Sequence, residues 1–388
     1  MDLDLTGEQR AIRESVARLC AGFDDHYWLE RDRAGEFPHA FHRAVAAGGW
    51  LGVAMPAAQG GAGLGITEAA LVMREIAESG AGMCGASSVH MNIFGLQPVV
   101  VYGNAEQKQR MLPPLIRGEE KACFAVTEPD AGLDTTRLRT RAVRRGDRYL
   151  VNGQKIWIST AQVADRMLLL ARTTPLEQVE RRTGGLSLFY TALDRTRIQV
   201  NEIRKMGRHG VDSNILLIED LEIPEADLIG REGEGFRQIL HGFNPERILI
   251  AAEAVGLGHA ALRRATAYAK ERRVFGRAIG QNQSIQHPLA ECWMQLEAAW
   301  LMAWKAARRY DAGRECGAEA NAAKYLAAEA AFRTCETAVL TLGGMGYAAE
   351  YHVERYLREC FIPRIAPVSA QMVKNFVAEK VLGLPRSY

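Results

Sequence analysis

The 388-residue sequence predicts an α+β protein with three successive domains, in the order helical, β and helical. Three observations predict this order. Apolar residues recur at helical spacing through residues 6–117, short apolar runs bounded by turn residues occupy residues 122–222, and helical spacing returns from Phe236 onward. We therefore place the domains at residues 1–121, 122–235 and 236–388.

The first domain is expected to consist of several helices separated by breaks. The breaks fall at Gly48-Gly49, at Gly60-Gly61 and at Asn104. Between the second and third breaks, residues 66–77 carry apolar residues at the spacing of one helical face. These features predict a helical unit before the β domain begins.

The second domain is expected to contain short strands and two polar segments that face a ligand. The first segment is the turn Thr127-Glu-Pro-Asp-Ala-Gly132, which follows an apolar strand abruptly. The second is Gln154-Lys-Ile-Trp-Ile-Ser159, which continues from a hairpin that we expect to close with Asn152-Gly153. Loop amides after a strand can face a ligand, and Thr127 and Ser159 add hydroxyls to the same wall. Further strands are expected at 167–171, 186–190 and 215–218.

The third domain is expected to hold long helices, with little punctuation before Gly313 and Gly343-Gly344. Within it, the segment Gly256-Leu-Gly-His-Ala-Ala261 formally matches a dinucleotide-binding fingerprint. No strand precedes this segment, so the geometry that cradles a phosphate is missing. We reject a nicotinamide site and expect the small residues to permit close helix packing.

Composition argues against several classes of protein. The net charge of +2 gives no reason to expect nucleic acid or an anionic membrane as a partner. No apolar run approaches the roughly 20 residues of a membrane-spanning helix, and the acidic start is unlike a signal peptide. Seven scattered cysteines fit reduced thiols. No metal-ligand cluster or nucleoside-triphosphate motif appears. We expect a cytoplasmic protein.

The two polar segments together resemble the flavin-facing β-domain of the acyl-CoA dehydrogenases. The resemblance covers essentially the whole chain, including Lys205-Met-Gly-Arg-His-Gly210 and Val353-Glu-Arg-Tyr-Leu-Arg358. It implies an N-terminal helical domain, a β-barrel-like middle domain and a C-terminal four-helix bundle. It also implies FAD as the cofactor, an acyl-CoA substrate, a homotetramer, and an electron-transfer flavoprotein as the partner that reoxidises the enzyme.

The resemblance also implies a set of cofactor-binding residues. One group has the pattern Arg-x-x-Phe-Gly, with a Gln eight residues after the Phe. In the family this group reaches the FAD of a neighbouring subunit, and a guanidinium suits phosphate oxygens. Taken singly, its members would be a charged helix end, a buried aromatic ring and an exposed amide. The implied cofactor-binding residues are Phe124, Val126, Thr127, Gly132, Trp157, Ser159, Arg272, Phe275, Gln283, Gly343, Gly344, Ser369 and Gln371.

The catalytic base departs from the commonest pattern of the family. Alignment through residues 353–358 puts Pro367 where many members carry Glu. Proline has no acidic group, and it lacks the N–H that relatives use to polarise the thioester carbonyl. In the isovaleryl and long-chain branches the Glu lies on the first long helix of the C-terminal domain, immediately before an Arg. Glu246 and Arg247 occupy that position, so we assign Glu246 as the base.

A purely structural interpretation of the same segment stays open. Asn244 is a good helix N-cap, Pro245 suits the first helical position, and Glu246 would then complement the helix dipole. The resemblance instead implies that Leu133, Phe243, Asn244 and Arg247 contact substrate. It places His90 on a helix beside the substrate channel, but for His90 and His209 alike we favour a structural role.

The resemblance implies α,β-dehydrogenation of an acyl-CoA. Glu246 removes the Cα proton while Cβ delivers a hydride to flavin N5, which gives the trans-2-enoyl-CoA. The position of the base favours a branched or long acyl chain. Two alternatives remain: an oxygen-using flavoenzyme of the same fold, such as a nitroalkane oxidase or a monooxygenase, and a catalytically inert family member.

Overall fold

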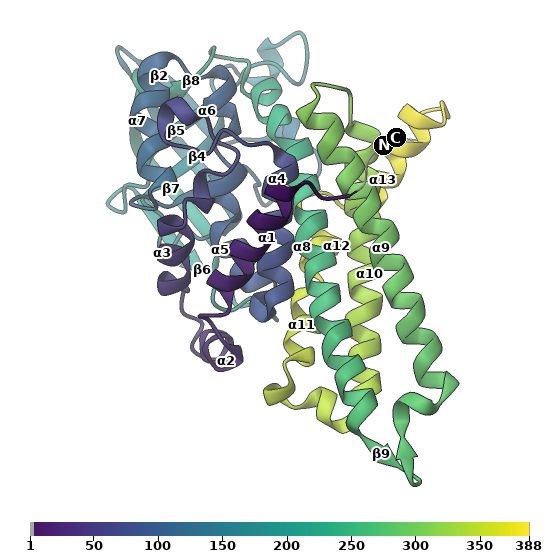
Figure 1. Ribbon diagram of the computed structural model, residues 1–388. Helices are drawn as coiled ribbons and strands as arrows, with labels where there is room; N and C mark the ends of the chain where they lie inside the picture. The colour runs from purple at the N-terminus through teal and green to yellow at the C-terminus, as the bar shows by residue number, and fades with distance from the viewer. Residues whose placement is uncertain (1–3, 388) are drawn as a thin grey trace.

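The computed structural model describes residues 4–387, so the first three residues of the acidic start and the last residue lie outside it. Figure 1 shows the N-terminal helices and the sheet side by side, with the long C-terminal helices along them. The predicted order of helical, β and helical parts is confirmed.

Seven helices form the N-terminal part of the chain. The predicted breaks are confirmed: Gly48-Gly49 follow α3, Gly60-Gly61 follow a short 3-10 turn, and Asn104 caps α7 by accepting a hydrogen bond from the Gln107 amide at 2.8 Å. Helix α4 is buried on nearly every side because it packs against α1, α8 and α9. The helices are α1 (Gly7–Cys20), α2 (Asp25–Ala34), α3 (His39–Ala47), α4 (Ile66–Ile76), α5 (Gly82–Phe94), α6 (Gln97–Tyr102) and α7 (Ala105–Ile116).

The middle part is an eight-stranded sheet with the order β6-β7-β3-β2-β4-β5-β8, and β1 pairs in parallel with β4. The strands predicted at 167–171, 186–190 and 215–218 lie within β4, β5 and β7. The bounds are β1 (Ala122–Ala125), β2 (Arg141–Arg145), β3 (Arg148–Ser159), β4 (Arg166–Arg172), β5 (Leu186–Ala192), β6 (Ile198–Glu202), β7 (Ser213–Pro224) and β8 (Leu228–Ile229).

The prediction that Asn152-Gly153 closes a hairpin is wrong. The turn between β2 and β3 is formed by Gly146 and Asp147, so that Arg145 pairs with Arg148. Asn152-Gly153 lies inside β3, at a shift in its register with β7. A Cβ at Gly153 would lie 2.4 Å from the Thr140 hydroxyl oxygen, so this glycine permits a close approach of the chain and forms no turn.

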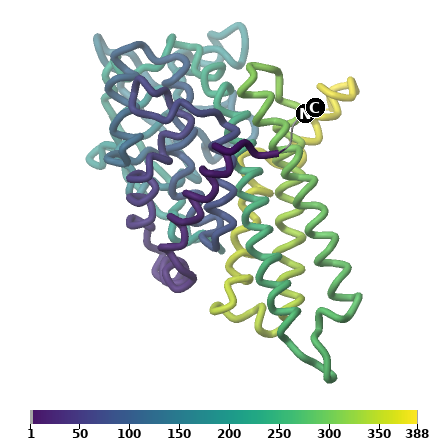
Figure 2. Tube along the Cα trace, in the orientation of Figure 1, coloured from purple at the N-terminus to yellow at the C-terminus, as the bar shows by residue number. Residues whose placement is uncertain are grey.

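Three long helices dominate the C-terminal part: α8 (Gly235–Glu271), α9 (Gln283–Asp311) and α10 (Gly317–Leu342). The short helices α11 (Val353–Glu359), α12 (Ile362–Ile365) and α13 (Ala370–Phe376) pack against α10, and α11 and α12 also against α8. Within the described residues, the predicted four-helix bundle therefore has three long helices, with these short helices packed beside them. A hairpin of β9 (Arg273–Val274) and β10 (Arg277–Ala278) joins α8 to α9 at the far tip (Figures 1 and 2).

Close packing explains the glycines of the rejected dinucleotide fingerprint. Gly256 and Gly258 lie inside α8, where a Cβ would lie 2.3 Å from the Arg74 carbonyl oxygen and 2.5 Å from the Leu296 side chain, respectively. The expectation that small residues permit close helix packing is confirmed. All seven cysteines are buried and free. Within residues 4–387, no helix has the length and hydropathy needed to span a bilayer.

Candidate active site

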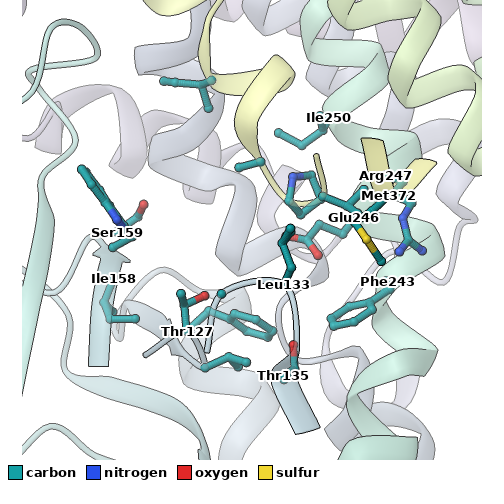
Figure 3. A pocket seen from close by; sticks show the side chains of 18 of the residues that line it. Thr127, Leu133, Thr135, Ile158, Ser159, Phe243, Glu246, Arg247, Ile250 and Met372 are labelled. Carbon is teal, nitrogen blue, oxygen red and sulfur yellow. The ribbon is translucent and has the colours of Figure 1, made fainter. Parts of the chain in front are cut away.

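A cavity of about 470 Å³ lies between the sheet and α8 (Figure 3). Its wall combines segments that are far apart in the chain: α5, the turn after β1, the end of β3, α8 and the loop before α13. The lining residues include Ser87, His90, Met91, Phe124, Val126, Thr127, Gly132, Leu133, Asp134, Trp157, Ile158, Ser159, Arg208, Phe243, Glu246, Arg247, Ile250, Ile362, Pro367 and Met372.

The turn after β1 is held in place by Glu128. Its carboxylate accepts hydrogen bonds from the buried Lys155 ammonium at 2.9 Å and from the amides of Arg139 and Thr140 at 2.6 and 2.9 Å. Burial opposes ionisation, but Lys155 and these donors still hold the pKa of Glu128 below its ordinary value. The Ile156 amide also donates to the Thr127 carbonyl at 2.9 Å, which joins the turn to β3. The Thr-Glu-Pro turn is therefore rigid, and the Glu128 carboxylate stabilises the turn rather than contacting a ligand.

A bulge at the end of β3 presents Trp157 to the cavity. The pairing of β3 with β7 shifts register between Lys155 and Ile158, and Trp157 has a left-handed φ of 62°. Its side chain is 57% exposed, which is unusual for a tryptophan next to a sheet core. The hydroxyl-bearing residues Thr127 and Ser159 line the same cavity. An aromatic face with hydroxyls beside it fits a flat ring that has polar edges, such as isoalloxazine.

Arg208 anchors this wall; it lies in the segment 205–210 that carries part of the family resemblance, but it was not predicted as a site residue. Its guanidinium donates hydrogen bonds to the hydroxyls of Ser87, Ser159 and Ser213 at 3.2, 2.9 and 3.1 Å. These contacts connect α5, β3 and β7 at the edge of the cavity. Arg208 thereby fixes Ser159, a residue that the sequence predicted at this site.

The opposite wall is one face of α8. Phe243, Glu246, Arg247 and Ile250 line the cavity at helical spacing. In Figure 3, Ser159 and Glu246 lie on opposite sides of it. Asn244 is outside the lining and instead accepts a hydrogen bond from Arg247 at 3.3 Å.

The helix-cap interpretation of this segment is wrong. Helix α8 begins at Gly235, so Asn244, Pro245 and Glu246 lie in its interior. Glu246 is therefore too far from the start of the helix to be stabilised by the helix dipole. Its environment is the cavity wall.

Glu246 has the properties of a proton acceptor. Burial raises its pKa to about 7, although His90 and Arg247 oppose this shift. Glu246 and Asp134 are the carboxylates among the lining residues of the described chain, and Asp134 is exposed. Pro367 lies in the cavity wall, so its loop brings no carboxylate there. Glu246 can accept a proton near neutral pH from a ligand between α8 and the sheet.

Eleven of the thirteen sequence-implied cofactor residues fall into two separate groups, and Ser369 and Gln371 belong to neither. Phe124, Val126, Thr127, Gly132, Trp157 and Ser159 all line the cavity. Ser369 caps α13 by accepting a hydrogen bond from the Met372 amide at 3.3 Å, and Gln371 is exposed; neither lines the cavity.

The second group lies at the tip of the long helices. Arg272 follows α8, Phe275 is fully exposed on the β9–β10 hairpin, Gln283 begins α9, and Gly343-Gly344 follow α10. The rise of α8 from Ile250 to its end at this tip corresponds to about 30 Å. Within one chain the two groups therefore cannot meet at one ligand site.

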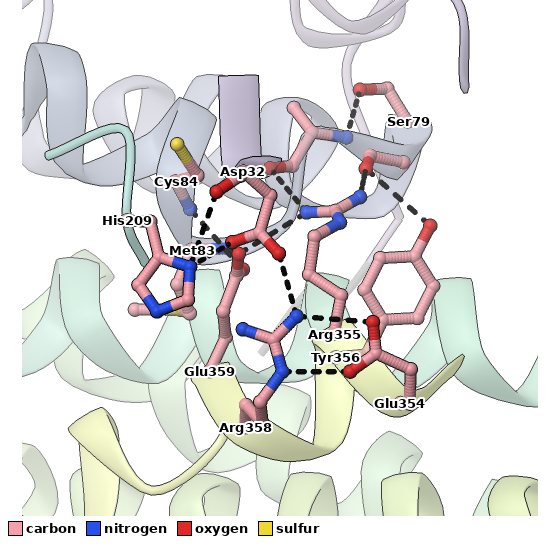
Figure 4. Close-up of polar contacts among 12 residues, drawn as sticks. Asp32, Ser79, Met83, Cys84, His209, Glu354, Arg355, Tyr356, Arg358 and Glu359 are labelled. Atoms are coloured by element: carbon pink, nitrogen blue, oxygen red, sulfur yellow. Dashed lines mark hydrogen bonds and ion pairs between the residues drawn. The ribbon is translucent and has the colours of Figure 1, made fainter. Parts of the chain in front are cut away.

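A buried ionic cluster holds α5, and with it part of the cavity wall (Figure 4). Arg358 donates to Asp32 at 2.6 Å, and Glu359 accepts from the Met83 amide at the start of α5 at 2.7 Å. His209 Nδ1 lies 3.1 Å from Asp32 Oδ1. Burial raises the pKa of Asp32, but His209 and Arg358 more than offset this and hold it below its ordinary value. His209 belongs to this cluster and is outside the lining of the cavity.

Comparison with known proteins identifies the family. The chain matches the N-terminal, middle and C-terminal domains of acyl-CoA dehydrogenases over residues 6–119, 123–221 and 233–382. It is 38% identical to the acyl-CoA dehydrogenase FadE12 of Mycobacterium tuberculosis, over 98% of this chain and 97% of that protein.

Solved structures agree. The structure of glutaryl-coenzyme A dehydrogenase with glutaryl-CoA has a TM-score of 0.95 at 30% identity and covers 100% of this chain and 98% of that one. The FAD complex of PigA has a TM-score of 0.93 at 28% identity, over 99% of this chain and 100% of that one. The chain thus belongs to the acyl-CoA dehydrogenases, a family of flavoprotein oxidoreductases that use FAD.

Proposed function

We propose that the protein catalyses the α,β-dehydrogenation of an acyl-CoA thioester, with Glu246 as the base that removes the Cα proton. The observation that carries this proposal is a half-buried carboxylate with a raised pKa in the cavity wall, opposite a wall that fits a flavin ring. An ordinary carboxylate is too weak a base for an α-proton. Burial strengthens Glu246 by raising its pKa to about 7.

The residues of the chain orient the reactants. Trp157, Thr127 and Ser159, which line the cavity, would hold the flavin ring. FAD, when bound, supplies the acceptor for the hydride that leaves Cβ. Phe243 and Arg247 flank the thioester from α8. With both ligands in place, the apolar lining excludes water, so the base keeps its raised pKa during the reaction.

The proton follows a separate path from the hydride. It moves from Cα to the Glu246 carboxylate, which starts ionised and ends neutral. A neutral carboxylic acid is the form that burial favours, so the environment that raises the pKa also stabilises the result of the transfer. We infer from the family that an electron-transfer flavoprotein then takes the electrons.

A second copy of the chain completes the cofactor site in this proposal. Arg272, Phe275 and Gln283 are exposed at the tip and lie too far from their own cavity to contact its ligand. In a homotetramer they would contact the FAD of a neighbouring subunit, with Arg272 at the pyrophosphate.

The test is anaerobic reduction of the bound flavin by a panel of straight, branched and aryl acyl-CoAs, followed by absorbance. At least one thioester should bleach the wild-type flavin. Glu246→Gln should keep its flavin but reduce it roughly a hundred- to ten-thousand-fold more slowly. Arg237→Gln, at an exposed α8 residue outside the cavity lining, is the control for general disturbance of α8.

Two results would contradict the proposal. Wild-type rates in Glu246→Gln would remove the assigned base. Reoxidation of the reduced, product-bound enzyme by air within the turnover time would favour the oxygen-using alternative.

A further inference from the structure

A second buried pair, formed by His90 and Glu253, lies beside the cavity. His90 is on α5 and lines the cavity, and its Nδ1 forms a short hydrogen bond with Glu253 Oε1. Glu253 is on α8 and is fully buried, and within residues 4–387 its second oxygen has no hydrogen-bond partner. The mechanism proposed above does not use this pair.

The contact fixes the charge of His90. A buried carboxylate with a single partner is stable as an ion only when that partner carries the opposite charge. Burial lowers the pKa of His90, but Glu253 outweighs it and the net shift is upward. The contact with Glu253 favours the imidazolium form of His90, in which both ring nitrogens are donors. Nδ1 is occupied by Glu253, and within residues 4–387 this is the one hydrogen bond that the His90 ring forms, which leaves Nε2 for a ligand in the cavity.

The pair lies deeper along α8 than the base. Glu253 is two turns after Glu246 on the same face of the helix, which corresponds to about 10 Å along the axis. Ile250 lies between them and is the last α8 residue that lines the cavity. If the CoA part of the substrate lies beside Phe243 and Arg247, the acyl group extends past Glu246 toward Ile250 and His90.

Apolar side chains and two charged groups surround His90 in the cavity. Met91 and Ile250 line the cavity, and the Phe94 ring packs edge-on against the imidazole of His90 with centroids 4.5 Å apart. Glu246 and Arg208 also line the cavity and act on the charge of His90, and Arg208 donates to the Ser87 hydroxyl. A cationic N–H without a hydrogen-bond partner in such a partly desolvated site is costly unless a ligand supplies an acceptor.

We propose that His90 is a specificity-determining residue for acyl groups that carry an oxygen acceptor. This inference rests on the proposed dehydrogenase function. The acceptor is a hydroxyl, keto or carboxylate oxygen on the acyl chain beyond Cα, bound by His90 Nε2–H. Glu253 is the positioning residue that keeps His90 charged and oriented. A plain alkyl chain leaves the imidazolium without a partner and is disfavoured, because a site with a buried donor discriminates against ligands that lack the acceptor.

Binding to Glu246→Gln holoenzyme tests this, because that variant should bind thioesters without converting them. The ligands are two matched series, butyryl-, 4-hydroxybutyryl- and succinyl-CoA and hexanoyl-, 6-hydroxyhexanoyl- and adipoyl-CoA. Dissociation constants come from the perturbation of the flavin spectrum. In at least one series an oxygenated ligand should bind about 10- to 100-fold more tightly than its alkyl match.

Variants of His90 separate the effect of its hydrogen-bond donor from the effect of its size. Adding His90→Phe should abolish the preference and tighten alkyl binding, whereas His90→Gln, which keeps a donor, should retain part of it. Met91→Leu changes the neighbouring side chain without touching the donor, and the preference should survive. Flavin content and melting temperature verify that each variant is folded.

The role of Glu253 is tested by measuring the preference for oxygenated ligands as a function of pH. Glu253→Gln removes the charge that keeps His90 protonated, so the preference should disappear at a lower pH than in the parent. The other charged groups at the cavity are Glu246, already replaced by Gln, and Arg208 and Arg247, which stay charged throughout. If Glu253 had only a structural role, Glu253→Gln would leave unchanged the pH at which the preference for oxygenated ligands is half lost. That result would overturn the assignment of Glu253 as the positioning residue.

The inference fails if alkyl thioesters bind as tightly as their oxygenated matches in both series, or if His90→Phe leaves the preference intact. Its failure differs from failure of the proposed function, which is judged by flavin reduction in the wild-type enzyme. If alkyl thioesters reduce the flavin and bind as tightly as their oxygenated matches, the dehydrogenase proposal is supported and His90 is not a specificity residue.

Discussion

At the scale of single residues, the environment of Glu246 decides what its carboxylate can do. The same side chain on the surface would be ionised at neutral pH and weakly basic. In the cavity wall, burial outweighs the attraction of His90 and Arg247, and the pKa rises to about 7. The residue then has the basicity that proton removal requires, at the cost of an unfavourable charge in the folded protein.

The pH dependence of flavin reduction should follow this carboxylate. Because only the ionised base accepts a proton, kcat/KM should rise with pH through a midpoint near 7 and then level off. Stopped-flow reduction between about pH 5.5 and 8.5 measures it. A midpoint near 4.5, the ordinary value for Glu, would place Glu246 in an exposed environment.

The same shift predicts a pH-dependent stability for Glu246→Gln. The folded-state pKa of Glu246 is raised, so folding disfavours its ionised form. This penalty is absent below the unfolded pKa and is complete above about pH 7. The variant should therefore match the wild type at about pH 4, below the unfolded pKa, and melt at a higher temperature at about pH 8. Equal melting temperatures at both values would contradict the burial of the charge.

At the scale of elements, much of the architecture could be predicted from local patterns, because periodicity reports which faces are buried. The domain order and several strand positions followed directly. The hairpin was misplaced because Asn-Gly is a strong turn signal, whereas Gly153 serves the close approach of Thr140. Contacts between distant segments left no local signal: His90 and Glu253 are 163 residues apart. The three serine partners of Arg208 could likewise be found only in the fold.

The turn after β1 should depend strongly on its buried ion pair. Glu128→Gln leaves the Lys155 ammonium buried without its anion and should cost about 3–5 kcal/mol of unfolding free energy. Glu222→Gln is the matched control, because Glu222 forms an exposed pair with Arg148 on the same sheet and should cost under about 1 kcal/mol. Urea denaturation of both variants tests this. Similar losses of unfolding free energy in the two variants would show that the buried pair stabilises the protein no more than the exposed pair does.

At the scale of the whole molecule, the cavity and the tip of one chain lie far apart, so the proposed FAD site requires a second chain to supply the tip residues. Every residue of the tip group is exposed, and Phe275 projects fully from its hairpin. A large exposed aromatic ring beside an arginine fits a contact with a second chain. The sequence could name these residues through the family resemblance, whereas the separation of the two groups required the fold.

Flavin retention should therefore depend on the tip. Arg272→Ala should weaken FAD binding about 10- to 100-fold, as expected for the loss of a charge-assisted contact to phosphate. Arg277→Ala is the control on the same hairpin, since Arg277 donates to Asn282 of its own chain. Flavin content per chain and light scattering measure the outcome. A monomer with full FAD occupancy would refute the shared site.

The buried ionic cluster also has a consequence for biosynthesis. Asp32 is paired with Arg358, which lies 326 positions later, and the Met83 amide is paired with Glu359, 276 positions later. On the ribosome, Asp32 can reach His209 once the middle domain has emerged, but nearly the whole chain must emerge before Arg358 and Glu359 complete the cluster. The N-terminal helices would meanwhile carry incompletely paired polar groups and exposed apolar surface, the kind of intermediate that chaperones bind. A fragment that stops before α11 should consequently accumulate as aggregate.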